Sequence, residues 1–172
     1  LFSSEAIQQA LANNQWIDWI EEATQGNASQ KEINLSLRGG SDKLKVYTAF
    51  NYNNTQGLLS NENQTRYGMR FNVDYQIRDW AKIGSSTSLT DTIKNSRGKN
   101  IFTKSLTAFP LGEPYDANGN INVNYIEGET SPFGDEIEDQ YADETRTTYA
   151  NINSDMEMTL LKGLTFRSQI DT

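Results

Sequence analysis

Carboxylates, amides and aromatic rings are the groups that could do chemistry in this sequence, because it contains neither cysteine nor histidine. That composition excludes disulfide frameworks, thiolate nucleophiles, histidine-based triads and the usual zinc ligand sets. An enzyme would have to work with carboxylates, Lys, Tyr or Ser alone, and no spacing in the chain indicates one. We therefore expect a protein that is not an enzyme, that uses no cofactor and that holds no metal.

A possible calcium loop is the most specific pattern of oxygen ligands. Asp116, Asn118 and Asn120 alternate around Gly119, as ligands of bound calcium do. The full EF-hand pattern is absent, because no Glu stands at the twelfth position of the loop. Asn-Gly is also the favoured dipeptide of a tight hairpin turn. We interpret the segment as a plain turn, with calcium binding as the alternative.

An acidic stretch follows. Paired carboxylates about 5 to 9.5 Å apart could hydrolyse glycosides, and clustered ones could bind calcium. A solvated loop is the simpler interpretation. The net charge of −8 also excludes nucleic acid as a partner, because phosphates would be repelled. The acidic residues are Asp135, Glu136, Glu138, Asp139, Asp143 and Glu144.

Four aromatic residues of the same region are candidate contacts for a substrate or for a lid protein, because aromatic rings stack on sugar rings and fill protein interfaces. Packing within the loop itself is the alternative, and it is favoured for any single one of them. The four residues are Tyr115, Tyr125, Phe133 and Tyr141.

The elements that would carry these residues are strands, because apolar and polar residues alternate with a period of two. The alternation is clearest between residues 67 and 77. One parity is apolar and carries Tyr67, Met69, Phe71, Val73, Tyr75 and Ile77. The other carries Gly68, Arg70, Asn72, Asp74 and Gln76. We assign the parity of Met69, Phe71 and Val73 to lipid and that of Arg70, Asn72 and Asp74 to a wet lumen.

The connections between the strands alternate between short and long. Residues 39–43, 78–80 and 161–164 form tight turns, whereas 53–64 and 91–147 are long. Outer-membrane barrels have this combination of short periplasmic turns and long extracellular loops. The strands also reach the ten or so residues that span a bilayer. We predict an all-β fold, a segment of an antiparallel transmembrane β-barrel with about six strands in three short-turn hairpins.

The remaining segments complete the expected organisation. Residues 1–30 form a loop and a short amphipathic helix at the barrel rim, over about residues 5–22. Residues 31–92 form four transmembrane strands, 93–146 a long extracellular loop with a helix near 100–108, and 147–172 a truncated transmembrane hairpin. About eight strands are the fewest that close a membrane barrel, so we expect further strands in a longer parent chain.

The chain resembles SusC/RagA-type TonB-dependent transporters over nearly its whole length, and the matching segments keep their order. They are Asn14–Asp18, Ile33–Lys43, Tyr47, Gln56–Gly57, Arg66–Tyr67, Arg70–Asp74, Asp79–Gly84, Phe109–Gly112, Tyr115–Asn120 and Leu161–Arg167. The resemblance implies part of the barrel of an outer-membrane importer from a Bacteroidota-type bacterium. It also implies oligosaccharides or peptides as substrates, a SusD-like surface lipoprotein as lid and coupling to the TonB complex through segments not present here.

A soluble β-sandwich that binds carbohydrate through exposed aromatic residues is the alternative, because soluble antiparallel sheets also alternate apolar and polar residues. A carboxylate-based hydrolase rests on acidic density alone.

Overall fold

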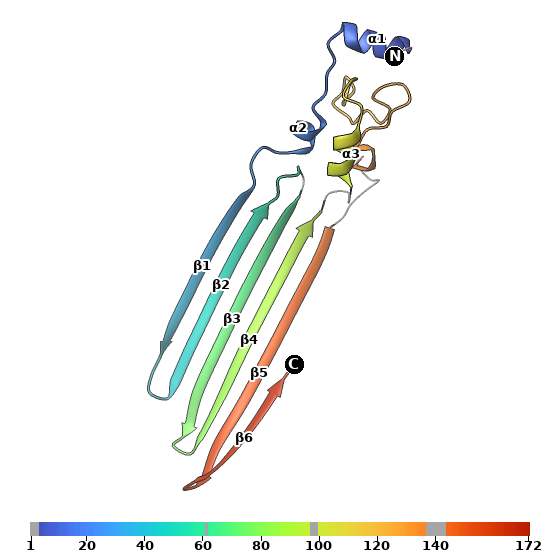
Figure 1. The fold of residues 1–172 in the computed structure, drawn as a ribbon. Coiled ribbons are helices and arrows are strands. Elements are labelled where there is room, and N and C mark those ends of the chain that lie inside the picture. The colour runs from blue at the N-terminus through green and yellow to red at the C-terminus, as the bar shows by residue number, and fades with distance from the viewer. Residues whose placement is uncertain (1–3, 61, 97–99, 137–143) are drawn as a thin grey trace. The chain divides into compact units, whose positions relative to one another are not determined.

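The computed structural model describes residues 4–60, 62–96, 100–136 and 144–172. Six strands form one sheet in the order β1-β2-β3-β4-β5-β6, so every strand lies beside its neighbour in sequence (Figure 1). The strands are β1 (Ser29–Gly40), β2 (Leu44–Gln56), β3 (Asn63–Arg78), β4 (Ala81–Asn95), β5 (Glu144–Leu161) and β6 (Leu164–Asp171). The predicted antiparallel sheet of three short-turned hairpins is confirmed.

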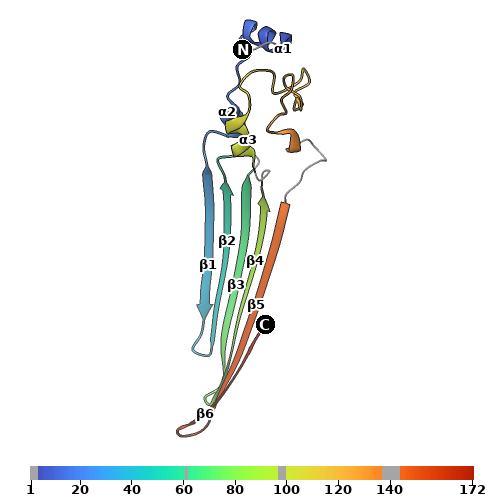
Figure 2. The same cartoon turned by 45° about the vertical axis from the view of Figure 1, so that its right-hand side comes forward.

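The strands are long, and apolar and polar residues alternate through their central parts. β3 has 16 residues and β5 has 18, whereas strands of soluble proteins usually have five or six. Figure 2 shows the strands as a single layer. In the register of β5 and β6, Met158 lies opposite Phe166 and Glu157 opposite Arg167. Apolar side chains thus meet on one face of the hairpin and charged ones on the other.

The tight turns have residues that suit them. Gly40 ends β1, and a Cβ atom at this position would lie 2.9 Å from the Leu44 carbonyl carbon and from Lys45 Cα. The Ser41 hydroxyl accepts a hydrogen bond from the Leu44 amide at 3.2 Å and so closes the β1–β2 turn. Gly163, with φ +87°, supplies the left-handed conformation in the β5–β6 turn.

The predicted helix over residues 5–22 is divided into α1 (Glu5–Ala12) and α2 (Trp19–Ala23). Asn14 has φ +57°, a conformation that interrupts a right-handed helix. Asp18 then begins α2, because its carboxylate accepts hydrogen bonds from the Ile20 and Glu21 amides at 3.0 Å. Periodicity alone did not reveal this new start. Within the described residues, no helix combines the length and the apolar character needed to cross a membrane.

The chain divides into two compact units. The first, here called the loop unit, consists of Leu1–Ser29, Gln56–Asn63 and Asn95–Glu144. It contains α1, α2, α3 (Ile101–Thr107) and the short 3-10 helix η1 (Gly134–Glu136). The second, here called the sheet unit, consists of Gln30–Thr55, Gln64–Lys94 and Thr145–Thr172. The helix expected near residues 100–108 is thus present as α3.

The loop unit has a hydrophobic core. It gathers residues from all along the unit, and α2 packs against α3. Trp19 lies at the centre, with its ring edge-on to Tyr125 at 4.7 Å and to Phe133 at 5.4 Å between centroids. The core residues are Ala10, Ile17, Trp19, Ala23, Ile101, Leu111, Tyr125, Ile126 and Phe133.

Candidate functional site: the two faces of the sheet and the loop unit

One face of the sheet presents apolar side chains that nothing in the sheet unit covers. Along β1, Ile33, Leu35 and Leu37 are 52%, 63% and 71% exposed. Met69 and Phe71 on β3 share this exposure, and Leu89, Ile152, Phe166 and Ile170 continue it on the later strands. Strand side chains of one parity share a face. The sheet therefore carries a continuous apolar surface, on the parity predicted to meet lipid.

Two tyrosines lie together on this apolar face. Tyr52 of β2 and Tyr67 of β3 have ring centroids 5.4 Å apart, and each belongs to the apolar parity of its strand. Tyr67 is the fifth residue of β3 and lies near the start of that strand. Aromatic pairs near strand ends are typical of the girdles that barrels place at the membrane interface.

A charged pair follows on the same parity of β4 and β5. Asp91 shares the parity of Ile83 and Leu89, and its carboxylate accepts two hydrogen bonds from Arg146, at 3.1 and 2.9 Å. The Thr148 hydroxyl donates a third at 2.6 Å. Both charges lie close to strand ends, where an ion pair can remain hydrated. The apolar part of the β4–β5 surface therefore ends before them.

The opposite face is polar and carries its own network. The Asn72 side-chain oxygen accepts a hydrogen bond from the Ser86 hydroxyl at 2.9 Å, which joins β3 to β4. Glu157 lies 3.8 Å from Lys82 Nζ and forms a second, closer ion pair with Arg167. One carboxylate thus links the cations of β4 and β6. The parity predicted to face the lumen is the one that carries these contacts.

Two glycines bring the polar side chains close to the backbone. A Cβ atom at Gly68 would collide with the Asn51 side-chain oxygen, and one at Gly84 would collide with the carboxylate of Asp155. Each glycine thus makes room for a polar group from the neighbouring strand. Sequence reasoning missed this role, because the partner strand of each glycine is known only once the register is known.

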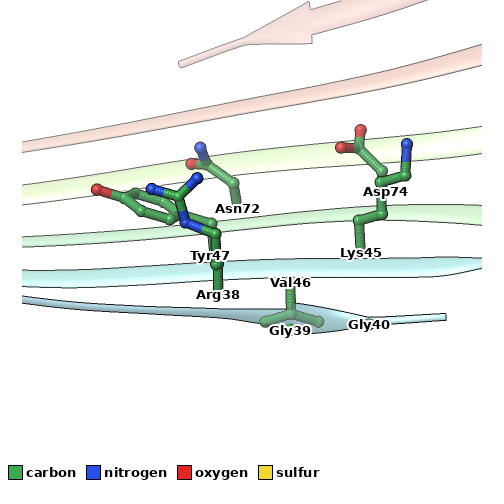
Figure 3. A pocket seen from close by; sticks show the side chains of 8 residues that line it. All are labelled: Arg38, Gly39, Gly40, Lys45, Val46, Tyr47, Asn72 and Asp74. Carbon is green, nitrogen blue, oxygen red and sulfur yellow. The ribbon is translucent and has the colours of Figure 1, made fainter.

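Several hollows lie on the polar face of the sheet unit. One hollow has a volume of about 500 Å³ and is lined by Arg38, Lys45 and Asp74, together with Tyr47 and Asn72. Figure 3 shows these side chains projecting to the same side of the strands. A smaller hollow of about 240 Å³ lies beside it, between Lys43 and Lys82. A third, of about 330 Å³, contains Arg66 and Arg70. Lysine and arginine side chains therefore line every one of these hollows.

Two of the four candidate contact residues are buried in the loop unit. Tyr125 is 4% exposed and Phe133 is 1% exposed, so both side chains pack within the loop unit. Phe109 organises this packing, because its carbonyl oxygen accepts hydrogen bonds from Trp19 Nε1 at 2.9 Å and from the Tyr125 hydroxyl at 3.0 Å. Burial, together with the negative charge of nearby Glu129, raises the pKa of Tyr125 above its usual value. The phenol therefore stays neutral.

Tyr115 is 40% exposed and begins the segment around residues 116–120. That segment is a turn bridged by Tyr115 and Ile121. The Asp116 carboxylate accepts hydrogen bonds from the amides of Asn118 and Asn120, both at 2.8 Å, as in an Asx turn. The contact from Asn120 is the main reason that the pKa of Asp116 lies below its usual value. Tyr115 stays the accessible candidate, while Tyr141 lies outside the described residues.

The acidic stretch is described only in part, because residues 137–143 lie outside the described residues. Asp135 forms an ion pair with Lys104 of α3. Among the described residues, no group of three or more carboxylates, histidines or cysteines is placed to hold a metal ion. Asp135 thus has a structural partner within the loop unit.

A hollow of about 300 Å³ in the loop unit was not foreseen. Carboxamides line much of it, and Tyr125 and Gly112 form part of its wall. Gln15 Nε2 donates a hydrogen bond to Glu113 Oε1 across it, at 2.5 Å. No sequence signal could have found it, because its walls come from segments about a hundred residues apart. The polar residues that line it are Gln9, Asn13, Gln15, Glu113 and Asn122.

Comparisons with known proteins agree with this geometry. No family model matches the sequence. The chain is 29% identical over 149 residues to TonB-dependent receptor P3 of Formosa agariphila, which covers 81% of this chain and 14% of that protein. It is 26% identical over 139 residues to TonB-dependent receptor P26 of the same organism, covering 81% of this chain and 13% of that protein.

Solved structures show the same fold. The structure of the RagAB peptide transporter matches with a TM-score of 0.67 and 24% identity, over 92% of this chain and 19% of that chain. A second structure, of the RagAB peptide importer in its closed-closed state, has the same TM-score and 23% identity over the same shares. The chain thus spans only a small part of each protein that it matches.

Proposed function

We propose that this chain, whose sequence and fold are those of a SusC/RagA-like TonB-dependent receptor, forms part of the wall of an outer-membrane importer. The proposal rests on the sheet, which exposes apolar side chains on one face and carries hydrogen-bonded and ion-paired side chains on the other. A soluble domain buries one face of a sheet under another layer. Here lipid covers the apolar face and the aqueous lumen wets the polar face.

The free edges of the sheet support the same proposal. β1 and β6 are edge strands whose outward backbone groups lack a strand partner in the described structure. Unpaired backbone groups are not tolerated in hydrocarbon, so strands of the same protein must pair with both edges and close the barrel. In this arrangement residues 31–92 and 147–172 span the membrane, residues 1–30 lie at the rim and residues 93–146 form an extracellular loop.

The soluble β-sandwich has no comparable support. Its second sheet would have to cover Leu35, Leu37 and Phe71, yet all described strands belong to one sheet and these side chains are exposed. An apolar surface of this extent is not stable in water without a partner. The lipid environment supplies that partner without a second protein layer.

We further propose that the imported nutrient is an oligosaccharide or a peptide, captured together with a SusD-like surface lipoprotein and driven inward by the TonB complex. Amide-lined hollows suit both ligands, because carboxamides donate and accept hydrogen bonds to hydroxyls and to peptide groups. The hollow beside Gln9 and Asn122, with exposed Tyr115 in the same unit, is the candidate contact surface. Import of this kind makes and breaks no bond of the nutrient.

Paired substitutions in the full-length protein test the proposal. Phe71→Asp places a carboxylate on the lipid face, where a charge near the membrane midplane costs on the order of 2 kcal/mol. Asn72→Asp adds the same charge to the polar face, one residue away. We expect Phe71→Asp to impair the heat-modifiable gel migration of the folded barrel, and Asn72→Asp to preserve it. Equal migration of both variants would contradict the assignment of the faces.

A further inference from the structure

The polar face of the first four strands is positively charged, although the whole chain has a net charge of −8. Lysines and arginines outnumber carboxylates on this part of the face. The cations are Arg38, Lys45, Arg66, Arg70, Arg78, Lys82 and Lys94, and the carboxylates are Glu32 and Asp74. The polar face of β5 and β6 carries Asp155, Glu157, Arg167 and Asp171 instead. Charge is therefore unevenly distributed around the wall.

Arg66 and Arg70 occupy a hollow of about 330 Å³ in this positive region, here called the arginine hollow. Gly68 lies between them on β3, and the small side chains of Ala49 on β2 and Ser88 on β4 are among their neighbours. The hollow is open because these neighbours do not fill it. Its lining residues are Asn34, Tyr47, Ala49, Asn51, Arg66, Gly68, Met69, Arg70, Ser88, Leu89 and Thr90.

The two guanidinium groups are uncompensated. No carboxylate lines the arginine hollow, and within the described part of the chain neither Arg66 nor Arg70 has an ion pair or a side-chain hydrogen bond. The nearby carboxylate of Glu32 instead accepts a hydrogen bond from Asn34 at 2.5 Å. Arg167, in contrast, pairs with Glu157 on the same face. Lys82 and Arg167 of the same face thus have a carboxylate partner, whereas the side chains of Arg66 and Arg70 stay exposed.

We propose that the arginine hollow binds carboxylate or sulfate groups of an extended ligand on its way through the lumen. This inference rests on the proposed importer function. Four residues along a strand span about 13 Å, so the two guanidinium groups suit two anionic groups of one oligomer. Arginine binds carboxylate and sulfate oxygens through charge-assisted, often bidentate hydrogen bonds. Tyr47 and Asn51 add further polar contacts in the same hollow.

The position of the hollow favours the transported ligand over another segment of the protein. Arg66 is the fourth residue of β3, close to the end of the strand where residues 57–62 arrive from β2, a connection longer than the turns at the other end of the sheet. In an outer-membrane barrel the long connections face the outside, from which the ligand enters. A ligand therefore reaches Arg66 and Arg70 before it reaches the mixed charges around Lys82 and Glu157.

Ligand binding to the full-length protein in detergent tests the inference. Hexaglutamate and a sulfated hexasaccharide serve as probes, with hexaserine and maltohexaose as their uncharged counterparts. We expect one or both charged probes to bind, and the double variant R66Q/R70Q to bind them about tenfold more weakly, as expected for the loss of charge-assisted hydrogen bonds. The charged probe that responds identifies the anionic group. Binding should also weaken as salt rises, because exposed charges are screened.

Three controls separate the outcomes. R78Q removes one positive charge from the same parity of β3 outside the hollow, and it should leave binding unchanged. R66K/R70K keeps the charge and should retain part of the binding. Heat-modifiable migration should be normal in all three variants. Unchanged binding in R66Q/R70Q, or an equal loss in R78Q, would overturn the inference while the barrel assignment stands. Abnormal migration of R66Q/R70Q alone would also overturn it, because the arginines would then support assembly.

Discussion

Phe133 and Phe71 carry the same side chain, but its exposure differs greatly between the two units. Phe133 is 1% exposed in the core of the loop unit, where it packs against the ring of Trp19. Phe71 is 48% exposed on the sheet unit and shares its face with other uncovered apolar residues. The loop unit is therefore held together by its own core, whereas the sheet unit needs an apolar solvent on one side. The two units therefore accommodate apolar side chains in different ways, one in a protein core and the other on an open face of the sheet.

The largest difference in stability is expected between alanine substitutions of these two phenylalanines. Phe133→Ala leaves a cavity in a packed core and should destabilise the loop unit by about 3 to 5 kcal/mol. Phe71→Ala should cost about 1 kcal/mol or less, because lipid chains refill the vacated space. Limited proteolysis of the full-length protein should show rapid cleavage within residues 95–144 only for Phe133→Ala. Similar protection in both variants would mean that the loop unit has no core of its own.

Two glycines of the loop unit test how tightly its segments are packed. Gly112 has φ +130°, and a Cβ atom there would lie 2.5 Å from the Tyr125 carbonyl oxygen and 2.9 Å from its ring. Gly112→Ala should therefore cost about 1 to 3 kcal/mol.

The matched control for this change is Gly128→Ala. Gly128 has φ +82° and no atom within 4 Å of the added Cβ, so only the backbone conformation is penalised, by about 1 kcal/mol. The same proteolysis assay should rank Gly112→Ala as the more damaging change. The reverse order would show that crowding at Tyr125 is not what fixes this loop.

A smaller loss of stability is expected when the ion pairs on the polar face of the sheet are broken. Glu157→Gln leaves Lys82 and Arg167 without their carboxylate, and each pair is partly exposed and screened by solvent, so the loss of stability should be small. Asp171→Asn removes a charge from the same face outside this network and serves as the control. The temperature at which heat-modifiable migration is lost should fall for Glu157→Gln alone. Equal temperatures for both variants would mean that the pairs contribute nothing to stability.

The smallest predicted effect concerns pH. The pKa of Asp116 is lowered in the folded state, so its carboxylate stabilises the turn above the unfolded pKa of about 3.9. That contribution is lost as the pH falls through the folded pKa. In Asp116→Asn the turn should be insensitive to acid in this range, as judged by hydrogen exchange at the Asn118 and Asn120 amides. Identical acid responses in the variant and the parent would contradict the role of the carboxylate.

The sheet was predictable from the sequence because its signal is local. A period of two over residues 67–77 fixes both the strand and its faces without knowledge of any partner. The turns at residues 39–43 and 161–164 are equally local, since glycine marks both. The predicted parities therefore agree with the exposed apolar face and with the ion pairs of Glu157.

The loop unit was less predictable because long-range contacts determine it. Trp19, Leu111 and Phe133 meet in one core although Trp19 and Phe133 are more than a hundred residues apart, and no periodic pattern in the sequence indicates this contact. The aromatic pattern alone could not separate buried Tyr125 from exposed Tyr115. The break at Asn14 was missed because the apolar spacing continues across it. The arginine hollow, similarly, emerges only when the neighbours of Arg66 and Arg70 on adjacent strands are known.

The central claim is that lipid covers one face of the sheet and water the other, and labelling along β3 tests it most directly. The chain has no cysteine of its own, so residues 69 to 74 of the full-length protein can be replaced by Cys one at a time and labelled with a bimane fluorophore. In vesicles that contain a lipid-attached quencher, we predict quenching at positions 69, 71 and 73 and little at 70, 72 and 74. Equal quenching at all six positions, or the opposite alternation, would contradict the account.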